Sequence, residues 1–235
     1  EIIECYLMSN KTYGYRRIRM NLNRYNDETY SINYIYRLMK SYGIKSIIRR
    51  KKPGYIKSTP DYIAENILDR NFSASKPNEI WLSDVTEFKA TNGRKLYLCA
   101  IMDLFDNSVV AYTLSTTPNN EQLYKTFKKA LKLNPGATPL FHSDRGYQYT
   151  SIQFKKMLEE QGITQSMSRV GKCIDNGPIE NLWGIIKTEM FYINKFNNTI
   201  EIEKAVNDYI EFYNNMRLQS KLKSQTPMEY RNLAI

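Results

Sequence analysis

The sequence predicts an α/β protein with a mixed five-stranded sheet flanked by helices, preceded by a small helical domain of helix-turn-helix type. Three observations support this fold class. Basic residues are concentrated in residues 1–60, three strand-like segments joined by short turns begin at residue 79, and alternating helices and strands follow them. With 235 residues, of which 42% are hydrophobic, the chain can bury one core of ordinary size and a smaller one.

Residues 1–60 have the pattern of short helices, over 2–8, 13–25 and 31–44. Ser31 is a candidate N-cap for the last of them, and Gly43 is a stop signal. This last segment places Ile and Leu at helical spacing, which predicts the core of a small helical module.

The charge of the chain is uneven. Its net charge is +10, and residues 1–60 hold 13 of the 34 Lys and Arg residues but only 4 of the 24 Asp and Glu residues. A basic head with interspersed tyrosines favours a nucleic acid as the partner, although a basic face is often only solvated surface. The candidate DNA-contacting residues of this head are Arg16, Arg17, Arg49, Arg50, Lys51 and Lys52.

Residues 61–78 predict a short helix and a polar connector. Strand-like segments follow at 80–90, 95–106 and 108–115, and Asn92-Gly93 is a strong hairpin signal between the first two. The remaining expected elements are a helix over Asn120–Leu133, a strand over 138–144, a helix over 151–162, a strand over 163–168, a helix over Ile179–Phe196 and a helix over Thr199–Asn214. Pro178 suits the first turn of the long helix.

This order predicts four regions. They are a basic helical domain (1–60), a connector (61–78), a catalytic-type core (79–197) and a C-terminal helical extension of that core (198–235).

Several classes of protein are disfavoured. The three cysteines form no CxxC pair and the chain has one histidine, which argues against a disulfide scaffold, a zinc finger or a histidine-rich metal site. The sequence has no apolar run long enough to cross a membrane and no signal-peptide pattern. We therefore expect a cytoplasmic protein.

Three acids stand out by position. Asp84 lies inside the first predicted strand, Asp144 at the end of the fourth and Glu180 in the first turn of the long helix. If the first and fourth strands are neighbours, these carboxylates can converge, as phosphoryl transfer with two divalent cations requires. Each acid could instead be an ordinary turn or cap residue, and Asp103 and Asp106 are competing candidates.

Five segments together resemble one known family. They are WLSDVTEF, KLYLCAIMDLF, HSDRGYQY, QSMSRVGKCIDNGPIEN and YIEFYNNMRLQSKLKSQTPMEY. In this order they resemble the catalytic half of bacterial insertion-sequence transposases of the DDE type, in the group whose enzyme is fused from two reading frames. The resemblance implies a ribonuclease-H-like, retroviral-integrase-like core that uses two Mg²⁺ or Mn²⁺ ions. Asp84, Asp144 and Glu180 match the family's catalytic and metal-binding acids, with 35 residues between the last two.

The resemblance also implies DNA contacts near the site. Lys187 lies seven residues after Glu180, which is about two helical turns. Arg145 and His142 flank Asp144, although His142 can equally be a packed strand residue, and Arg169 and Lys172 lie in the segment that leads to Glu180.

The sequence departs from the family at three places. Ser83 stands where Thr is common, Arg145 where Gln is usual, and DNGPIENLW replaces the usual pattern around the glutamate. None of these changes removes a carboxylate.

The function expected from this resemblance is metal-dependent cleavage of DNA 3′ ends and strand transfer during transposition. Expected partners are transposon-end and target DNA, further copies of the chain on paired ends, and the first-frame product or a fusion with it. The expected location is the bacterial cytoplasm, at the nucleoid. The alternatives are a hydrolytic ribonuclease-H-like nuclease and a non-enzymatic DNA-binding remnant or regulator.

Overall fold

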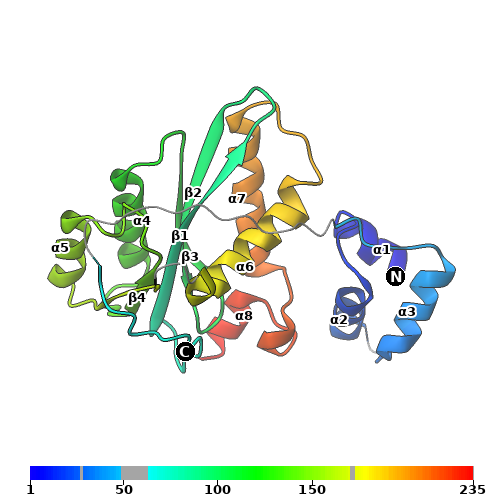
Figure 1. Ribbon diagram of the computed structural model, residues 1–235. Coiled ribbons are helices and arrows are strands. Elements are labelled where there is room, and N and C mark those ends of the chain that lie inside the picture. The colour runs from blue at the N-terminus through cyan, green and yellow to red at the C-terminus, as the bar shows by residue number, and fades with distance from the viewer. Residues whose placement is uncertain (27–28, 49–62, 170–172, 235) are drawn as a thin grey trace.

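The computed structural model describes residues 1–26, 29–48, 63–169 and 173–234. Three N-terminal helices form one unit, and a sheet with helices on both faces forms the other (Figure 1). No helix in the described part of the chain is long and apolar enough to cross a membrane.

The N-terminal unit contains α1 (Ile2–Met8), α2 (Tyr15–Tyr25) and α3 (Ile32–Ser41), as the sequence predicted. Its small core is formed by Tyr13, Ile18, Leu22, Ile35 and Met39. The hydroxyl of Ser31 accepts a hydrogen bond from the Tyr34 N–H at 3.2 Å, which confirms the predicted cap.

The sheet contains β1 (Ile80–Lys89), β2 (Lys95–Asp103), β3 (Val109–Ser115), β4 (Leu140–Ser143) and β5 (Gln165–Met167). Its strand order is β3-β2-β1-β4-β5. The pairs β1–β2 and β2–β3 are antiparallel, whereas β1–β4 and β4–β5 are parallel. The mixed five-stranded sheet and the contact between its first and fourth strands are therefore confirmed.

Alternating side chains of the strands serve two apolar cores. Leu82 and Leu98 face α6 (Gly177–Ile186) and α7 (Thr199–Asn215), which cover one side of the sheet (Figure 1). On the other side, residues such as Trp81 and Ile101 pack against α4 (Asn120–Leu133) and α5 (Ile152–Glu160). Period-two alternation, with apolar residues on both faces, is what a central strand covered on two sides requires.

The long helix predicted over Ile179–Phe196 is interrupted. Helix α6 ends at Ile186 and continues as a π-helical turn, η2 (Lys187–Phe191). This wider turn buries Glu189, whose carboxylate accepts hydrogen bonds from Arg217 at 2.9 Å and also pairs with Arg17 of α2. A distant ionic partner, which local periodicity does not reveal, thus accompanies the change of helix type.

The C-terminal helix is held to the sheet by ion pairs of a buried arginine. After the short turn η3 (Ser220–Leu222), α8 (Pro227–Asn232) begins with a capping box between Thr226 and Glu229. Arg231 of α8 donates hydrogen bonds to Asp103 at 2.9 Å and to Asp106 at 2.7 Å. Asp103 and Asp106, the competing catalytic candidates, are therefore partners of a buried arginine.

The short helix predicted within 61–78 is wrong over the described residues 63–78, which contain no helix. Residues 65–68 of this segment instead lie beside β5. The N–H groups of Ile67 and Leu68 donate to the Ser166 hydroxyl at 3.0 and 3.1 Å, and the Met167 N–H donates to the Glu65 carbonyl at 3.1 Å. Contacts with β5 satisfy backbone groups that a helix would have paired internally.

Candidate active site

Two of the predicted acids lie side by side because of the parallel β1–β4 pairing. Ser83 of β1 is in register with Ser143 of β4, so Asp84 and Asp144 follow at the same level of the sheet. Both side chains are half-buried.

The carboxylate of Asp84 is oriented from two directions. Its Oδ1 accepts a hydrogen bond from the Val85 N–H at 2.7 Å, and its Oδ2 accepts one from the indole Nε1 of Trp183 at 2.8 Å. Trp183 is buried against the core. Its hydrogen bond ties α6, the helix that carries Glu180, directly to Asp84.

Asp144 depends on a nearby glycine. The Gly146 N–H donates to Asp144 Oδ1 at 2.8 Å, and a Cβ added at residue 146 would lie 3.0 Å from that same oxygen. Gly146 therefore leaves the space for a close approach to the carboxylate, whereas its backbone does not adopt the left-handed conformation.

The third acid, Glu180, is exposed in the first turn of α6. Burial raises the pKa of Asp84 well above its ordinary value, the charge of Asp144 raises it further, and Glu180 adds a smaller effect. Burial also raises the pKa values of Asp144 and Glu180, and for Glu180 the charge of Asp144 contributes. These directions are those expected of carboxylates that influence one another in a partly buried site.

This donor set suits a hard divalent cation. Within the described residues, none of the three carboxylates forms an ion pair with a basic side chain. Mutually repelling, partly buried carboxylate oxygens without a cationic partner are the ligand chemistry that Mg²⁺ and Mn²⁺ take. No group of three His, Cys, Asp or Glu in the described ranges forms a ready-made metal cluster. Mg²⁺ commonly takes only one or two carboxylates and completes its shell with water and substrate phosphates.

His142 does not lie where it could contact DNA. The imidazole is fully buried, with Nδ1 at 2.9 Å from the Ser166 hydroxyl and Nε2 at 3.2 Å from the Ser168 hydroxyl. Burial lowers the pKa of His142 to about 4, so the ring is neutral. His142 is therefore a packed strand residue, which was the alternative prediction, and the structure does not support His142 as a DNA contact.

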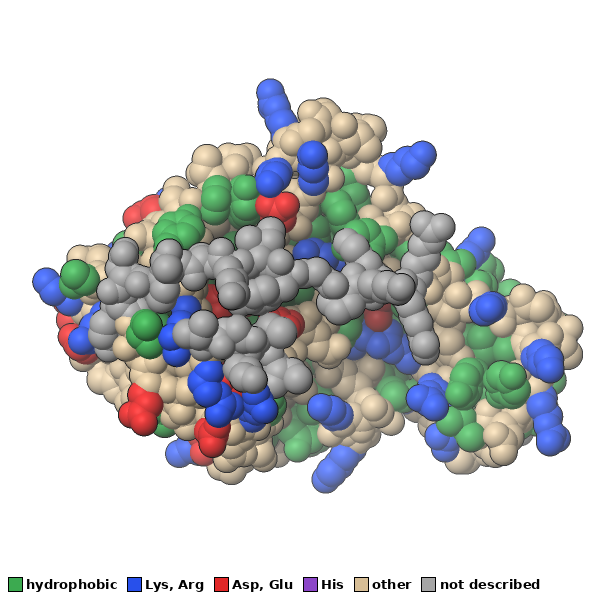
Figure 2. Space-filling view, viewed as in Figure 1, with side chains coloured by type: hydrophobic (Ala, Val, Ile, Leu, Met, Phe, Trp, Pro, Cys, Tyr) green, Lys and Arg blue, Asp and Glu red, His purple; other side chains and the backbone are tan. Residues whose placement is uncertain are grey.

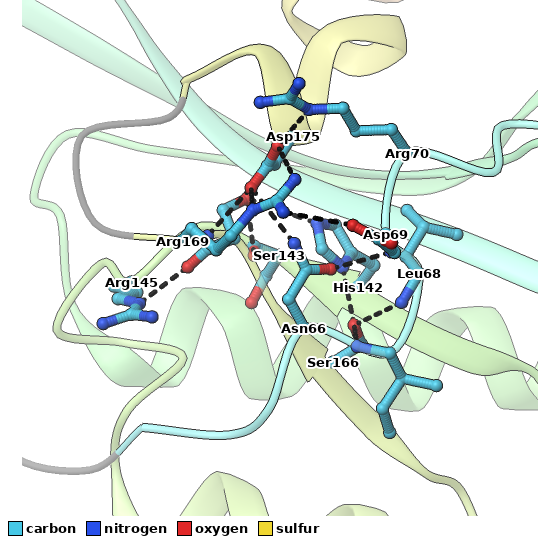
Figure 3. A network of polar contacts seen from close by, with 12 residues as sticks. Asn66, Leu68, Asp69, Arg70, His142, Ser143, Arg145, Ser166, Arg169 and Asp175 are labelled. Atoms are coloured by element: carbon cyan, nitrogen blue, oxygen red, sulfur yellow. Dashed lines mark hydrogen bonds and ion pairs between the residues drawn. The ribbon is translucent and has the colours of Figure 1, made fainter.

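The segment before Glu180 is held by a network around the buried carboxylate of Asp175 (Figure 3). Arg169 donates to it from its backbone N–H at 3.0 Å and from its guanidinium at 2.9 Å. Arg70 and Asn66 of the connector donate to the same carboxylate at 2.6 and 3.1 Å. The roles of Arg70 and Asn66 could not be predicted from the sequence, because a partner more than a hundred residues away leaves no local signal.

The other residues predicted to contact DNA differ in how exposed they are, and several lie outside the described residues. Arg145 is half-buried and donates to the Ser168 carbonyl at 2.6 Å, whereas Arg16 is exposed on α2. The ammonium group of Lys187 lies 5.8 Å from the ring centroid of Phe88, on the face of α6–η2 that meets β1. Lys172, Arg49, Arg50, Lys51 and Lys52 lie outside the described residues.

Replacing Asp175 with Asn is expected to lower the Tm by about 5 °C. Hydrogen bonds from the Arg169 side chain, followed by those from Arg70, hold the pKa of Asp175 well below its usual range despite burial. A lowered pKa means that this stabilisation is present above the unfolded-state value of about 3.9 and is lost as the pH falls below it. The Tm difference between the wild type and the variant should therefore shrink in acid, which thermal melts over a pH series would measure.

The matched control for this variant is Asp69→Asn. Asp69 also pairs with Arg169, at 3.1 Å, but its side chain is 74% exposed. We expect little change in Tm from this substitution. Equal effects of the two substitutions would show that the network around Asp175 does not hold the segment.

Comparison with known proteins agrees with this architecture. Residues 74–173 and 180–235 match models of the integrase core domain, and residues 1–52 match a model of an HTH-like domain. The chain is 44% identical over 234 residues to InsK, by name a transposase of insertion sequence element IS150 from Escherichia coli K12, covering 98% of this chain and 81% of that protein. It is 41% identical to a transposase-like protein of Haemophilus influenzae, covering 88% of this chain and 97% of that protein.

Solved structures share the fold at lower identity. The integrase catalytic core of HTLV-2, determined in complex with magnesium, aligns with a TM-score of 0.54 and 21% identity over 68% of this chain and 99% of that one. A chain of the simian T-cell lymphotropic virus intasome aligns with a TM-score of 0.56 and 16% identity over 97% of this chain and 73% of that one.

Proposed function

The chain belongs to the DDE-type transposases of insertion sequences, which carry an integrase core domain, and from this premise we propose that it cuts DNA at the 3′ ends of its element and joins them to target DNA. The observation that supports the proposal is the parallel pairing of β1 and β4, which brings Asp84 level with Asp144 at the end of β4, together with the hydrogen bond from Trp183 of α6, the helix that carries Glu180, to Asp84. This arrangement includes no activated serine or cysteine nucleophile, so water and then the freed 3′-hydroxyl would serve as nucleophiles.

Asp84, Asp144 and Glu180 are the residues that would hold two divalent cations, Mg²⁺ or Mn²⁺. When bound, such ions activate the attacking oxygen and stabilise the leaving oxygen of an in-line displacement at phosphorus. Trp183 and Val85 fix the direction of the Asp84 carboxylate, and Gly146 does the same for Asp144. Glu180 is exposed at the mouth of the site, where the α6 N-terminus also favours a negatively charged phosphate group.

Basic side chains around this edge would position the DNA. Lys187 follows Glu180 by seven residues and lies near Phe88 of β1, Arg145 comes directly after Asp144, and Arg169 lies in the segment that leads to Glu180. Arg16 and Arg17 of the HTH-like unit, together with Lys172, Arg49, Arg50, Lys51 and Lys52 beyond the described residues, are proposed as further phosphate contacts. Such contacts position DNA and carry no sequence information by themselves.

The proposal extends to organisation and partners. We propose that residues 1–60 and 61–78 form a DNA-binding head and a connector, and that residues 79–197 and 198–235 form the catalytic core and its extension. The protein would act on the bacterial nucleoid as a homo-oligomer that pairs two element ends, together with the first-frame product or in fusion with it.

A strand-joining assay tests the proposed function. The substrate would be a duplex with the terminal sequence of the protein's own element, cut at its 3′ end, and the target a supercoiled plasmid. Covalent joining that requires Mg²⁺ or Mn²⁺ would support the proposal. Cleavage without joining would favour a hydrolytic nuclease, and DNA binding without either reaction would favour a regulator.

Adding Mn²⁺ is expected to raise the Tm of the wild-type protein and not that of Asp84→Asn. A cation relieves the repulsion among the carboxylates only in the folded state, and the stabilisation grows by about 1.4 kcal/mol for each tenfold excess over the Kd. Thermal melts over a Mn²⁺ series measure this effect. Asp208→Asn, an exposed change on α7, is the control and should respond like the wild type. The same response in Asp84→Asn would argue against metal binding at these acids.

A further inference from the structure

A basic groove lies between the N-terminal unit and the C-terminal part of the chain. It has a volume of about 790 Å³ and is bounded on one side by α2 and on the other by residues 217–224. Its basic lining residues are Arg16, Arg17, Arg19, Arg24, Arg217, Lys221 and Lys223, and none of the described residues that line it is acidic. Lys and Arg side chains are also prominent around the junction of the two units in Figure 2.

The two walls are held against each other by ion pairs. Arg17 of α2 pairs with Glu189, which Arg217 also contacts at 2.9 Å. Arg24 of α2 pairs with Glu229 of α8 at 2.8 Å. Phe212 of α7 packs against the apolar core of the N-terminal unit. The groove is therefore formed by contacts that the fold makes between the units.

The C-terminal wall is a defined turn. Backbone hydrogen bonds join Gln219 N–H to the Gln225 carbonyl at 2.9 Å and Ser224 N–H to the Gln219 carbonyl at 3.1 Å. Lys223 and Ser224 adopt φ values of 54° and 61°. This left-handed conformation is unfavourable for a residue with a Cβ, and such strain is concentrated at functional sites. The turn presents Lys221 and Lys223 to the groove.

The positive charge of the groove is only partly balanced. Glu189 and Glu229 neutralise part of the charge of Arg17, Arg217 and Arg24. In the part of the chain that the structure describes, no carboxylate pairs with the other four basic lining residues, which are Arg16, Arg19, Lys221 and Lys223. Like charges held together in this way repel one another until an anion binds between them.

The chemistry of the lining identifies the class of anion. Gln219, Ser220 and Ser224 offer uncharged hydrogen-bonding groups beside the cations, as phosphate and sugar oxygens require. Among the described residues, no aromatic side chain lines the groove, whereas single-stranded nucleic acid is usually bound by stacking on aromatic rings. In a helix-turn-helix, moreover, the helix before the recognition helix crosses the DNA backbone, and α2 precedes α3.

We infer that this groove binds one sugar–phosphate strand of duplex DNA, with α2 contacting one side of the strand and Lys221 and Lys223 the other. The inference rests on the proposed function for the identity of DNA as the substrate. It adds a phosphate site in the C-terminal region, outside both the acidic triad and the HTH-like unit. DNA bound there would hold the N-terminal unit and the catalytic part in one relative position.

The test removes charge from the C-terminal wall only. In the double variant Lys221→Gln/Lys223→Gln the side chains remain long and polar, and the helical unit is unchanged. The control, Lys128→Gln/Lys132→Gln, removes the same charge from exposed positions on α4, on the other side of the sheet. Binding of the full chain to a labelled duplex of arbitrary sequence would be measured by fluorescence anisotropy over a salt series, and thermal melts would verify that the variants are folded.

The groove variant is expected to bind duplex DNA roughly tenfold more weakly at low salt, with a slope of log K against log salt reduced by about 2, whereas the control binds like the wild type. Unchanged affinity and slope in the groove variant would overturn the inference, as would a loss confined to single-stranded DNA. The result is separable from the proposed function. If the groove variant binds DNA like the wild type and joining still depends on Asp84, only the groove inference is rejected. If Asp84→Asn joins DNA normally, only the catalytic proposal is rejected.

Discussion

Asp84→Asn is expected to reduce 3′-end cleavage and strand joining by at least about 10³-fold while the protein remains folded and binds DNA. Asp84 lies at the centre of the candidate site, next to Asp144 on the neighbouring strand and hydrogen-bonded to Trp183 of the helix that carries Glu180. An amide at this position has no negative charge with which to hold a cation.

The same substitution should change stability little, because two effects oppose each other. Removing the Asp84 charge removes the cost of burying that charge and its repulsion from Asp144, which are the two main causes that raise the pKa of Asp84. The amide, however, accepts from only one of the two present donors, the Val85 N–H and the Trp183 indole, which costs about 1 kcal/mol. We therefore expect the free energy of unfolding to stay within about 2 kcal/mol of the wild-type value.

Paired assays would check this prediction. Joining, duplex affinity and Tm would be measured for Asp84→Asn and for the surface control Asp208→Asn, which should resemble the wild type in all three. Joining at the wild-type rate would contradict the assignment of the acids. Unfolding of the variant would show that Asp84 is primarily a structural residue.

The largest expected effect on stability is that of Arg231→Met, at about 3–5 kcal/mol. The Arg231 guanidinium bridges Asp103 and Asp106, both fully buried, and also donates to Asn78 at 2.7 Å and Asn134 at 3.0 Å. Burial, and then the charge of Asp106, already raise the pKa of Asp103. Without the arginine, two adjacent carboxylates remain buried with no cation between them.

Chemical denaturation would measure this loss, with Arg24→Met as the matched control. Arg24 also pairs with a residue of α8, but its side chain and that of Glu229 are 31% and 40% exposed. A partly exposed pair of this kind contributes up to about 1 kcal/mol. Restoration of part of the stability by a second change, Asp103→Asn, would attribute the loss to the unpaired carboxylate. Similar small effects of Arg231→Met and Arg24→Met would contradict the prediction.

The sequence by itself determined the strands of the sheet and the acids that are proposed for the site. Alternation in IWLSDVTEFK and the Asn92-Gly93 turn predicted the first hairpin, and β1 and β2 occupy these segments. The order of elements allowed the first and fourth strands to be neighbours, and the pairing of β1 with β4 brings Asp84 level with Asp144. These features depend on residues a few positions apart, since pleat, turn and helix periodicities are local.

Only the tertiary structure decided which polar groups are partners. Arg231 and Asp103 are 128 positions apart, and Arg17 and Glu189 are 172 apart. The burial of His142, the hydrogen bond from Trp183 to Asp84 and the groove between α2 and residues 217–224 likewise arise only when distant segments pack together. An ion pair or a buried hydrogen bond needs two complementary groups that are close in space, and these groups can be any distance apart along the chain. No local sequence pattern therefore specifies such a contact. Folding alone determines which charges are compensated and which stay available for DNA.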